Sequence, residues 1–224
     1  MTPDDLTPMH ENPAKTPNAV GVTGGIGSGK TEVCTAFASL GARVCAADEL
    51  AKELLTTHPE VRKEVAARFG SDVYSSDGSL DRKRLARLAF ADDALLGKLN
   101  AIVHPKVTEE LRAIIAREKT ERTAPLIVVE AALIYEARIE GLFDYVIAVD
   151  AAEPLRVERA AKRDGTTRES ILERMRAQLV PDEVAERADF VIRNAGDLAG
   201  LRSQCAFLFT LLTRIQPPSE AGRP

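Results

Sequence analysis

Short apolar runs alternate with longer amphipathic stretches along most of this 224-residue chain. Leu126–Glu130 and Tyr145–Asp150 are continuous apolar runs that each end in a carboxylate. Such runs are typical of strands that are buried on both faces of a parallel sheet. Shorter runs at residues 20–23, 42–48 and 190–192 predict three further strands, and the second of these also ends on a carboxylate.

The stretches between these runs space their apolar residues as helices do. A helix is predicted over residues 32–40, and a closing helix follows residue 197. Residues 57–119 show helical patterns and no strand pattern, so they predict a helical insertion between the second and third strands. Its apolar positions are Val61, Val65, Phe69, Leu85, Leu88, Val107, Leu111, Ile114 and Ile115. Strands that alternate with helices predict an α/β fold around a mainly parallel five-stranded sheet.

A glycine-rich segment separates the first strand from the helix that follows it. Residues 23–31 read Thr-Gly-Gly-Ile-Gly-Ser-Gly-Lys-Thr, which contains the P-loop pattern G-x-x-x-x-G-K-[ST]. Without Cβ atoms, glycines let backbone N–H groups converge on phosphate oxygens, and the helix N-terminus adds positive potential. Lys30 is expected at the β- and γ-phosphates and Thr31 at Mg²⁺. A purely structural turn is the alternative, and the strand–loop–helix order disfavours it.

Two carboxylates follow predicted strands at the edge where open α/β sheets bind ligands. Asp48 is expected to face the P-loop as a general base or metal-shell ligand, with helix capping as its alternative role. Glu130 either orients Mg²⁺ through water or has a structural hydrogen-bonding role.

An arginine-rich segment follows the fourth strand. Arg156, Arg159 and Arg163 recur at i, i+3 and i+7, on one helical face, and the Arg-Asp-Gly sequence that ends at Gly165 predicts a turn or hinge. Interleaved acidic residues also fit an ordinary solvated face. Because phosphoryl transfer needs cations over the migrating group, we favour a lid that carries Arg159 and Arg163.

Composition restricts the remaining possibilities. No apolar run approaches 18 residues, so no transmembrane helix is expected, and the net charge of −4 disfavours a general nucleic-acid binder. The three cysteines form no C-x-x-C pair, which favours a reduced, cytoplasmic protein. Residues 1–18 and 216–224 are polar and proline-rich and are predicted to be disordered tails around a single domain, residues 19–215.

Taken in order, these motifs resemble the dephospho-coenzyme A kinase family. The matching segments are the glycine loop at 23–31, Ala47-Asp48, His104-Pro105, the Arg-x-x-x-Arg-Asp-Gly lid at 159–165 with Gln178, and Ala-Asp-x-x-Ile-x-Asn-x-Gly at 188–196. The resemblance implies a three-layer P-loop kinase fold. Its parts would be a core of residues 19–56, 120–155 and 186–215, an acceptor-binding insertion at 57–119 and a lid at 156–185.

The resemblance also implies a reaction, the transfer of the γ-phosphoryl group of ATP, with Mg²⁺, to the ribose 3′-hydroxyl of dephospho-CoA. This reaction is the last step of coenzyme A biosynthesis. Asp48 would be the base, and Lys30, Arg159 and Arg163 would neutralise charge. The nucleotide-binding residues implied are Gly25, Ile26, Gly27, Ser28, Gly29, Lys30, Thr31, Asn194 and Gly196, with Thr31 also at the metal. The acceptor-binding residues implied are Asp48, Phe69, Gly70, Arg82 and His104.

Two segments depart from the family pattern. Ala46 stands where the family commonly has aspartate, and residues 132–136 lack the family's proline. His104 either contacts the acceptor or caps or braces the insertion.

The sequence pattern also fits two other functions. One is another small-molecule or nucleoside kinase, and the other is a nucleotide-dependent switch. The Asn-Lys-x-Asp motif of GTPases is absent, and residues 197–200 fit D-x-x-G only after the last strand. The sequence leaves the oligomeric state open, with a slight preference for a monomer.

Overall fold

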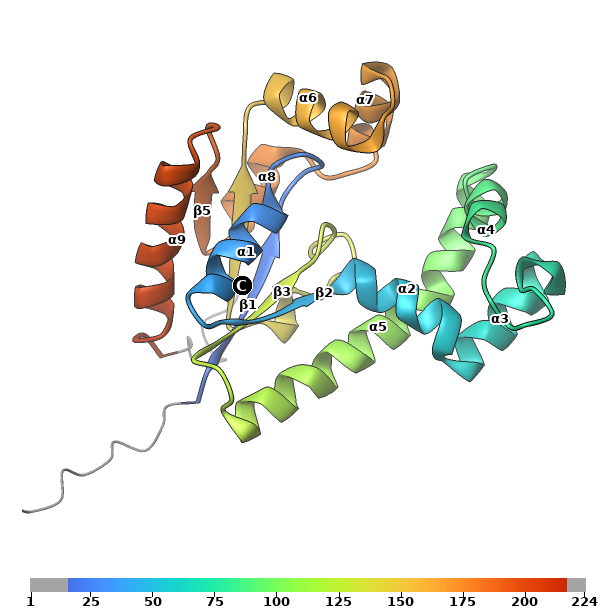
Figure 1. The fold of residues 1–224 in the computed structure, drawn as a ribbon, viewed down its shortest axis with the longest axis horizontal. Coiled ribbons are helices and arrows are strands. Elements are labelled where there is room, and N and C mark those ends of the chain that lie inside the picture. Colours follow the sequence, from blue (N-terminus) through green and yellow to red (C-terminus); the bar gives the residue numbers. More distant parts are fainter. Residues whose placement is uncertain (1–15, 217–224) are drawn as a thin grey trace, which may run out of the picture.

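A parallel sheet with helices on both faces forms the centre of the computed structural model, which describes residues 16–216 (Figure 1). The strands are β1 (Asn18–Thr23), β2 (Arg43–Ala46), β3 (Leu126–Glu130), β4 (Tyr145–Asp150) and β5 (Phe190–Arg193). They pair in the order β2-β3-β1-β4-β5, and every pairing is parallel. The predicted five-stranded α/β sheet is therefore confirmed, and all strands end at one edge of it.

The helices form four groups around the sheet (Figure 1). One face is covered by α1 (Lys30–Ser39) and α9 (Leu198–Leu212). The other is covered by α8 (Pro181–Arg187) and part of α5 (Asp93–Glu121). Beyond the strand ends lie α6 (Glu153–Asp164) and α7 (Arg168–Arg176). An arm projects sideways and contains α2 (Ala47–Thr57), α3 (Pro59–Phe69), the 3₁₀ turn η1 (Ser71–Val73) and α4 (Arg82–Ala89). A second 3₁₀ turn, η2 (Glu140–Leu142), precedes β4.

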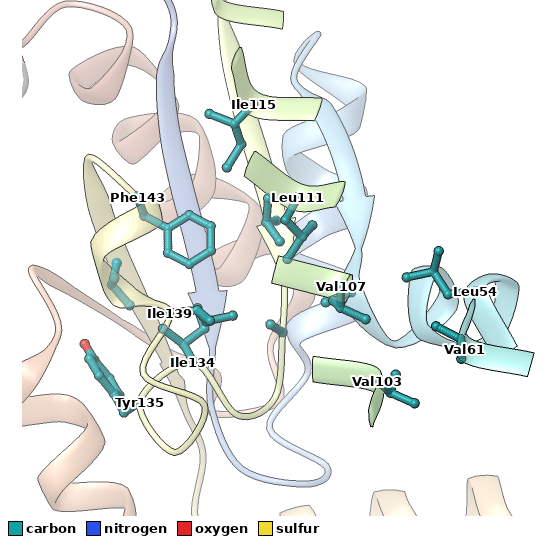
Figure 2. Close-up of a cluster of buried hydrophobic side chains, with 14 of the residues drawn as sticks. Leu54, Val61, Val103, Val107, Leu111, Ile115, Ile134, Tyr135, Ile139 and Phe143 are labelled. Atoms are coloured by element: carbon teal, nitrogen blue, oxygen red, sulfur yellow. The ribbon is translucent and has the colours of Figure 1, made fainter. Parts of the chain in front are cut away.

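Alternate residues of the central strands supply two separate apolar cores. Val20 and Val22 of β1 pack with the α1 and α9 side, whereas Ala19 packs on the opposite face. Between them, Gly21 makes room for two side chains, because a Cβ atom there would lie 2.7 Å from atoms of Ile134 and Phe143. The core on the α5 side of the sheet is called the second core. Figure 2 shows it, with the Phe143 ring beside β1. The period-two pattern of the strands therefore produces three layers.

One long helix joins the arm to the sheet. Leu111 and Ile115 of α5 pack under the sheet, while Val103 of the same helix lies toward Leu54 and Val61 of the arm (Figure 2). These side chains belong to one continuous cluster of buried residues. The predicted boundary between insertion and core at residue 119 therefore does not separate two packed units, since it falls inside the last turn of α5.

The predicted tails extend too far into the domain. Asn18 already belongs to β1, is buried, and donates from Nδ2 to the carbonyl of Leu212 at 2.6 Å. At the other end, the carbonyl of Gln216 accepts a hydrogen bond of 2.6 Å from the Tyr145 hydroxyl. Both residues are held by contacts that a local composition pattern does not reveal. The rest of the predicted tails, residues 1–15 and 217–224, lies outside the described residues.

The predicted lid at 156–185 is also too wide. Val157 and Ala160 of α6 and Ile171 of α7 form a small apolar cluster apart from the two sheet cores, as a separate lid unit requires. By contrast, Val184 of α8 packs into the core on the α5 side of the sheet. The small cluster is therefore formed by α6 and α7, and α8 belongs to the central layers.

The three cysteines lie inside the fold or partly inside it. Cys34 and Cys205 are buried and Cys45 is half-buried, all three are free, and burial raises the pKa of each thiol.

Among residues 16–216, no helix combines the length and the apolar character needed to cross a membrane.

A matched pair of phenylalanines tests the second core. Phe143 is 1% exposed and Phe207 is 68% exposed. We expect Phe143→Ala to lower the free energy of unfolding by about 3–5 kcal/mol, because it opens a cavity beside Gly21. Phe207→Ala should change it by less than about 0.5 kcal/mol. Urea denaturation followed by circular dichroism measures both values, and equal losses would contradict this description of the core.

Candidate active site

The glycine loop between β1 and α1 is held from outside by neighbouring segments. Gly27 and Gly29 have φ values of 75° and 96°, a left-handed conformation that favours glycine. Added Cβ atoms at these positions would lie 2.1 Å from the carbonyl oxygen of Arg156 and 2.1 Å from Nδ2 of Asn194. The loop therefore requires these glycines both for its turn and for its close contact with α6 and with the segment after β5.

Asn194 fastens the loop to the end of β5. The side chain is 4% exposed, and its Nδ2 donates to the carbonyl of Ser28 at 2.9 Å. Its Oδ1 accepts weaker bonds from the backbone N–H of Gly196 and from Nη2 of Arg159, both at 3.4 Å. The structure thus places Asn194 beside the loop, and Gly196 next to Asn194 and Arg159.

Lys30 lies at the centre of the charged groups in the site. Its ammonium donates to the carbonyls of Gly24 at 2.8 Å and Gly25 at 3.3 Å. Burial lowers the pKa of Lys30, whereas the charges of Glu130 and Asp48 raise it and that of Arg163 lowers it further. Side chains from α1, β3, α2 and α6 therefore all act on this one ammonium group.

Thr31 and Glu130 form a hydroxyl–carboxylate pair at the start of α1. The Thr31 hydroxyl donates to Oε1 of Glu130 at 3.1 Å. The register of the sheet explains the contact, because Glu130 is paired with Val22 of β1 on one side and with Ala46 of β2 on the other. Glu130 thus stands between the strand that leads to the P-loop and the strand that leads to Asp48.

Asp48 is not the last residue of a strand, and that prediction is corrected. β2 ends at Ala46, and Asp48 lies in the first turn of α2, where it is exposed. The capping alternative is also wrong, because the residue at the N-cap is Ala46. The Ala-Ala-Asp-Glu sequence starts a helix early, since acidic side chains are favoured in a first helical turn. Asp48 still faces Lys30 closely enough for its charge to affect that group.

The lid arginines differ in how they are held. Arg163 donates from Nε and Nη2 to Asp164 at 2.7 and 3.2 Å, and Arg174 donates to the same carboxylate at 2.7 Å. The hydrogen bond from Arg163 is the main reason why the pKa of Asp164 falls to about 2. Arg159 is half-buried, and its Nη1 has no partner among residues 16–216.

The predicted acceptor residues lie along the arm. Phe69 is buried in the arm core, and Gly70 ends α3 with a φ of 97°. Arg82 is exposed at the start of α4. The pKa of Glu49, in the first turn of α2, is lowered first by a hydrogen bond from Lys52 and also by the charge of Arg82. The arm cation is therefore within electrostatic range of the helix that carries Asp48.

His104 is in the middle of α5, so it cannot cap a helix, and that alternative is wrong. The side chain is half-buried, and burial lowers its pKa, which keeps the imidazole neutral at physiological pH. Its carbonyl accepts a hydrogen bond of 2.8 Å from the Thr108 hydroxyl. Pro105 follows within the helix, where its ring removes one backbone donor. A bracing role and an acceptor contact are both compatible with this position.

Two residues at the site were not assigned a role from the sequence. Oε1 of Gln178 accepts from the backbone N–H of Ile26 at 2.9 Å, so that loop amide is already bonded to the segment after α7. Oε1 of Glu136 accepts from the backbone N–H of Leu179 at 3.0 Å. Gln178 had a signal, because it follows the arginine motif in the family pattern. Glu136 lies in the segment that lacks the family's proline.

The donors around the loop fit a phosphate group. Three buried polar atoms there have no partner among residues 16–216: Oγ of Ser28, Nε of Arg156 and Nη1 of Arg159. Each can donate to an anion. The hydroxyl and carboxylate oxygens of Thr31 and Glu130 are the hard ligands that Mg²⁺ prefers. Among the described side chains, no group of three or more His, Cys, Asp and Glu forms a metal site.

Comparison with known proteins identifies the family of this chain. The family model described as dephospho-CoA kinase matches residues 18–200. A curated dephospho-CoA kinase from Chlorobaculum tepidum is 40% identical over 208 residues, which is 91% of this chain and 99% of that protein. This chain belongs to the dephospho-CoA kinase family.

Solved structures of similar proteins extend the comparison. A crystal structure from Thermus thermophilus has a TM-score of 0.72 and 36% identity, covering 88% of this chain and 99% of that one. The dephospho-CoA kinase from Campylobacter jejuni has a TM-score of 0.62 and 25% identity, covering 88% and 98%. The predicted P-loop kinase fold is confirmed, and family membership makes the chain an ATP-using phosphotransferase of coenzyme A biosynthesis.

Proposed function

We propose that this site transfers the γ-phosphoryl group of ATP to the ribose 3′-hydroxyl of dephospho-CoA, the last step of coenzyme A biosynthesis. The observation that carries the proposal is the convergence on Lys30. A carboxylate from α2, a carboxylate from β3 and a lid guanidinium all influence the pKa of one ammonium group, which itself contacts the glycine loop. In the proposed reaction, these groups would supply the base, a carboxylate beside the metal and the cations for the phosphates.

The glycine loop and Lys30 would hold the polyphosphate. Backbone amides at the start of α1 offer donors, and the Ser28 hydroxyl, which has no protein partner in the described chain, is available to donate as well. Lys30 would exchange its bonds to the carbonyls of Gly24 and Gly25 for phosphate oxygens. The nucleotide base would lie on the side of Asn194 and Gly196.

Mg²⁺ would be held by the Thr31 hydroxyl, with Glu130 accepting hydrogen bonds from the metal-bound water. When bound, the ion supplies positive charge that offsets the charge of the phosphates. Glu130 hydrogen-bonds Thr31 in the structure, so it also orients the hydroxyl. Its two alternative roles from the sequence are therefore compatible.

Asp48 would take the proton from the acceptor hydroxyl. It lies exposed in the first turn of α2, and its charge acts on Lys30. Residue 46, where the family commonly has aspartate, is alanine. We therefore assign the proton-accepting role to Asp48.

Arg159 and Arg163 would neutralise the charge on the migrating group. Arg159 already lies next to Asn194, whereas Arg163 is paired with Asp164 and would exchange that carboxylate for a phosphate. Closure of α6 and α7 over the site would exclude water, which otherwise competes with the acceptor hydroxyl.

The arm would bind dephospho-CoA. Arg82 supplies an exposed cation near α2, which suits the diphosphate of the acceptor. Phe69, Gly70 and the neutral His104 would shape the wall of the acceptor site. The charge of Arg82 acts on Glu49, the neighbour of Asp48 in α2, so an acceptor held at Arg82 would present its ribose toward the proposed base.

The choice of acceptor is the first experiment. ADP release from MgATP should be stimulated by dephospho-CoA, and the product should be heavier by one phosphate in mass spectrometry. Adenosine, shikimate and nucleoside monophosphates should leave the rate at its basal level. Stimulation by one of these instead would overturn the assignment of the arm, and ATP binding without stimulation by any acceptor would point to a nucleotide-dependent switch.

A neighbouring pair of acidic residues tests the base. Asp48→Asn should leave ATP binding nearly intact and lower kcat by roughly 10²-fold or more, because the amide cannot accept the proton. Glu49→Gln is the matched control, since Glu49 is exposed and paired with Lys52 at 2.6 Å. Its kcat should stay within about a factor of two of the unmodified enzyme. Near-normal turnover in Asp48→Asn would disprove the role of Asp48.

Two threonines of α1 test the metal site. Thr31→Val should raise the Mg²⁺ concentration at half-maximal activity by roughly tenfold, because it removes a ligand. Thr35→Val removes a hydroxyl one turn later, which bonds only the Thr31 carbonyl at 2.8 Å, and should leave the Mg²⁺ dependence unchanged. An unchanged Mg²⁺ requirement in Thr31→Val, measured by coupled ADP assay, would refute the assignment.

A further inference from the structure

Arg156 lies against the glycine loop, apart from the two lid arginines. It belongs to the first half of α6, and its side chain is 5% exposed. A Cβ atom added to Gly25 would lie 2.7 Å from Nη1 and 2.9 Å from Cζ of this side chain. The backbone carbonyl of Arg156 meets the loop again at Gly27. The residue therefore packs on the loop with both its main chain and its guanidinium.

The guanidinium of Arg156 is buried without an anionic partner. No ion pair joins it to a carboxylate anywhere in residues 16–216, and its Nε has no hydrogen-bond acceptor in that part of the chain. Arginine stays charged at all relevant pH values. A buried, unpaired charge destabilises a fold unless another charge compensates for it. The buried charge of Arg156 therefore lowers the stability of the ligand-free protein.

The other polar groups at this place point to the compensating charge. Ser28 Oγ and Arg159 Nη1 are buried donors without partners in the described chain, and the glycine loop lies between α1 and α6. All of these groups favour an anion, and the anion that a glycine loop binds is a polyphosphate. Lys30 also contacts the loop, through the carbonyls of Gly24 and Gly25, and Arg159 contacts Asn194. Arg156 differs from both because its buried guanidinium packs on Gly25 and no acceptor within residues 16–216 binds its Nε.

We propose that Arg156 is a positioning residue of the phosphate site, whose buried charge acts through the backbone at Gly25 to strengthen polyphosphate binding. The proposal rests on the proposed role of the glycine loop as the phosphate cradle. It adds that affinity for phosphate is obtained at the expense of the stability of the ligand-free protein. Removing the charge should therefore weaken phosphate binding and raise the stability of the ligand-free protein.

Three variants and a series of inorganic ligands test this idea. Arg156→Met keeps the apolar stem and removes the charge, Arg156→Gln keeps some polarity, and Arg156→Lys keeps the charge. Lys162→Met is the matched control, because Lys162 is an exposed cation of the same helix. The ligands are phosphate, pyrophosphate and tripolyphosphate, measured by isothermal calorimetry and by thermal unfolding with and without ligand.

We expect Arg156→Met and Arg156→Gln to bind tripolyphosphate roughly tenfold more weakly, with a loss that grows with the charge of the ligand. Their Tm without ligand should equal or exceed that of the unmodified protein. Arg156→Lys should retain most of the affinity, and Lys162→Met should match the unmodified protein. In the two neutral variants, the KM for ATP should rise by a factor similar to the loss of tripolyphosphate affinity, while kcat should change less.

Three results would overturn the proposal. Unchanged tripolyphosphate affinity in Arg156→Met would remove the electrostatic role. A lower Tm without ligand, or failure of both neutral variants to fold, would show that Arg156 is a structural brace. If the unmodified protein bound no polyphosphate, the assignment of the glycine loop would fall as well, which separates that failure from failure of the role of Arg156 alone.

Discussion

The buried amide of Asn194 holds the glycine loop from outside, and the arrangement of the site depends on this contact. Its bond to the Ser28 carbonyl fixes the loop at the end of β5, while Gly29 leaves the space that the amide occupies. Because all strands are parallel, the same edge also carries Glu130, the last residue of β3, and Asp48, which follows β2 in the first turn of α2. The loop is thus the reference point around which the charged groups are arranged.

The sheet and the loop could be predicted from the sequence because their signals are local. The apolar runs that end at Glu130 and Asp150 gave β3 and β4 with their observed bounds, and the glycine motif needed only a strand before it and a helix after it. Boundaries set by distant contacts were predicted less well. Asn18 is ordered by Leu212, and α8 joins the sheet through Val184, and neither contact leaves a periodic pattern nearby.

The site was predicted in its residue types more than in its geometry. Helical spacing placed Arg156, Arg159 and Arg163 on one face, yet α6 buries the first, half-buries the second and exposes the third. Spacing cannot distinguish these environments, because they depend on where the loop and Asn194 approach the helix. Similarly, Asp48 was expected at the end of a strand, but α2 begins at Ala47, which puts Asp48 in a first helical turn.

The ion pair between Arg163 and Asp164 determines how readily this guanidinium can exchange its carboxylate partner for a phosphate. Both side chains lie near the surface, with 61% and 25% of their side-chain area exposed, so the ion pair contributes only about 0–1 kcal/mol. A phosphate oxygen therefore competes for this guanidinium against a weak partner. Arg174 donates to the same carboxylate, so Asp164 would keep one partner if Arg163 turned to a phosphate. In the proposed reaction, the exchange of Asp164 for a phosphate oxygen would therefore subtract little from the free energy of phosphate binding.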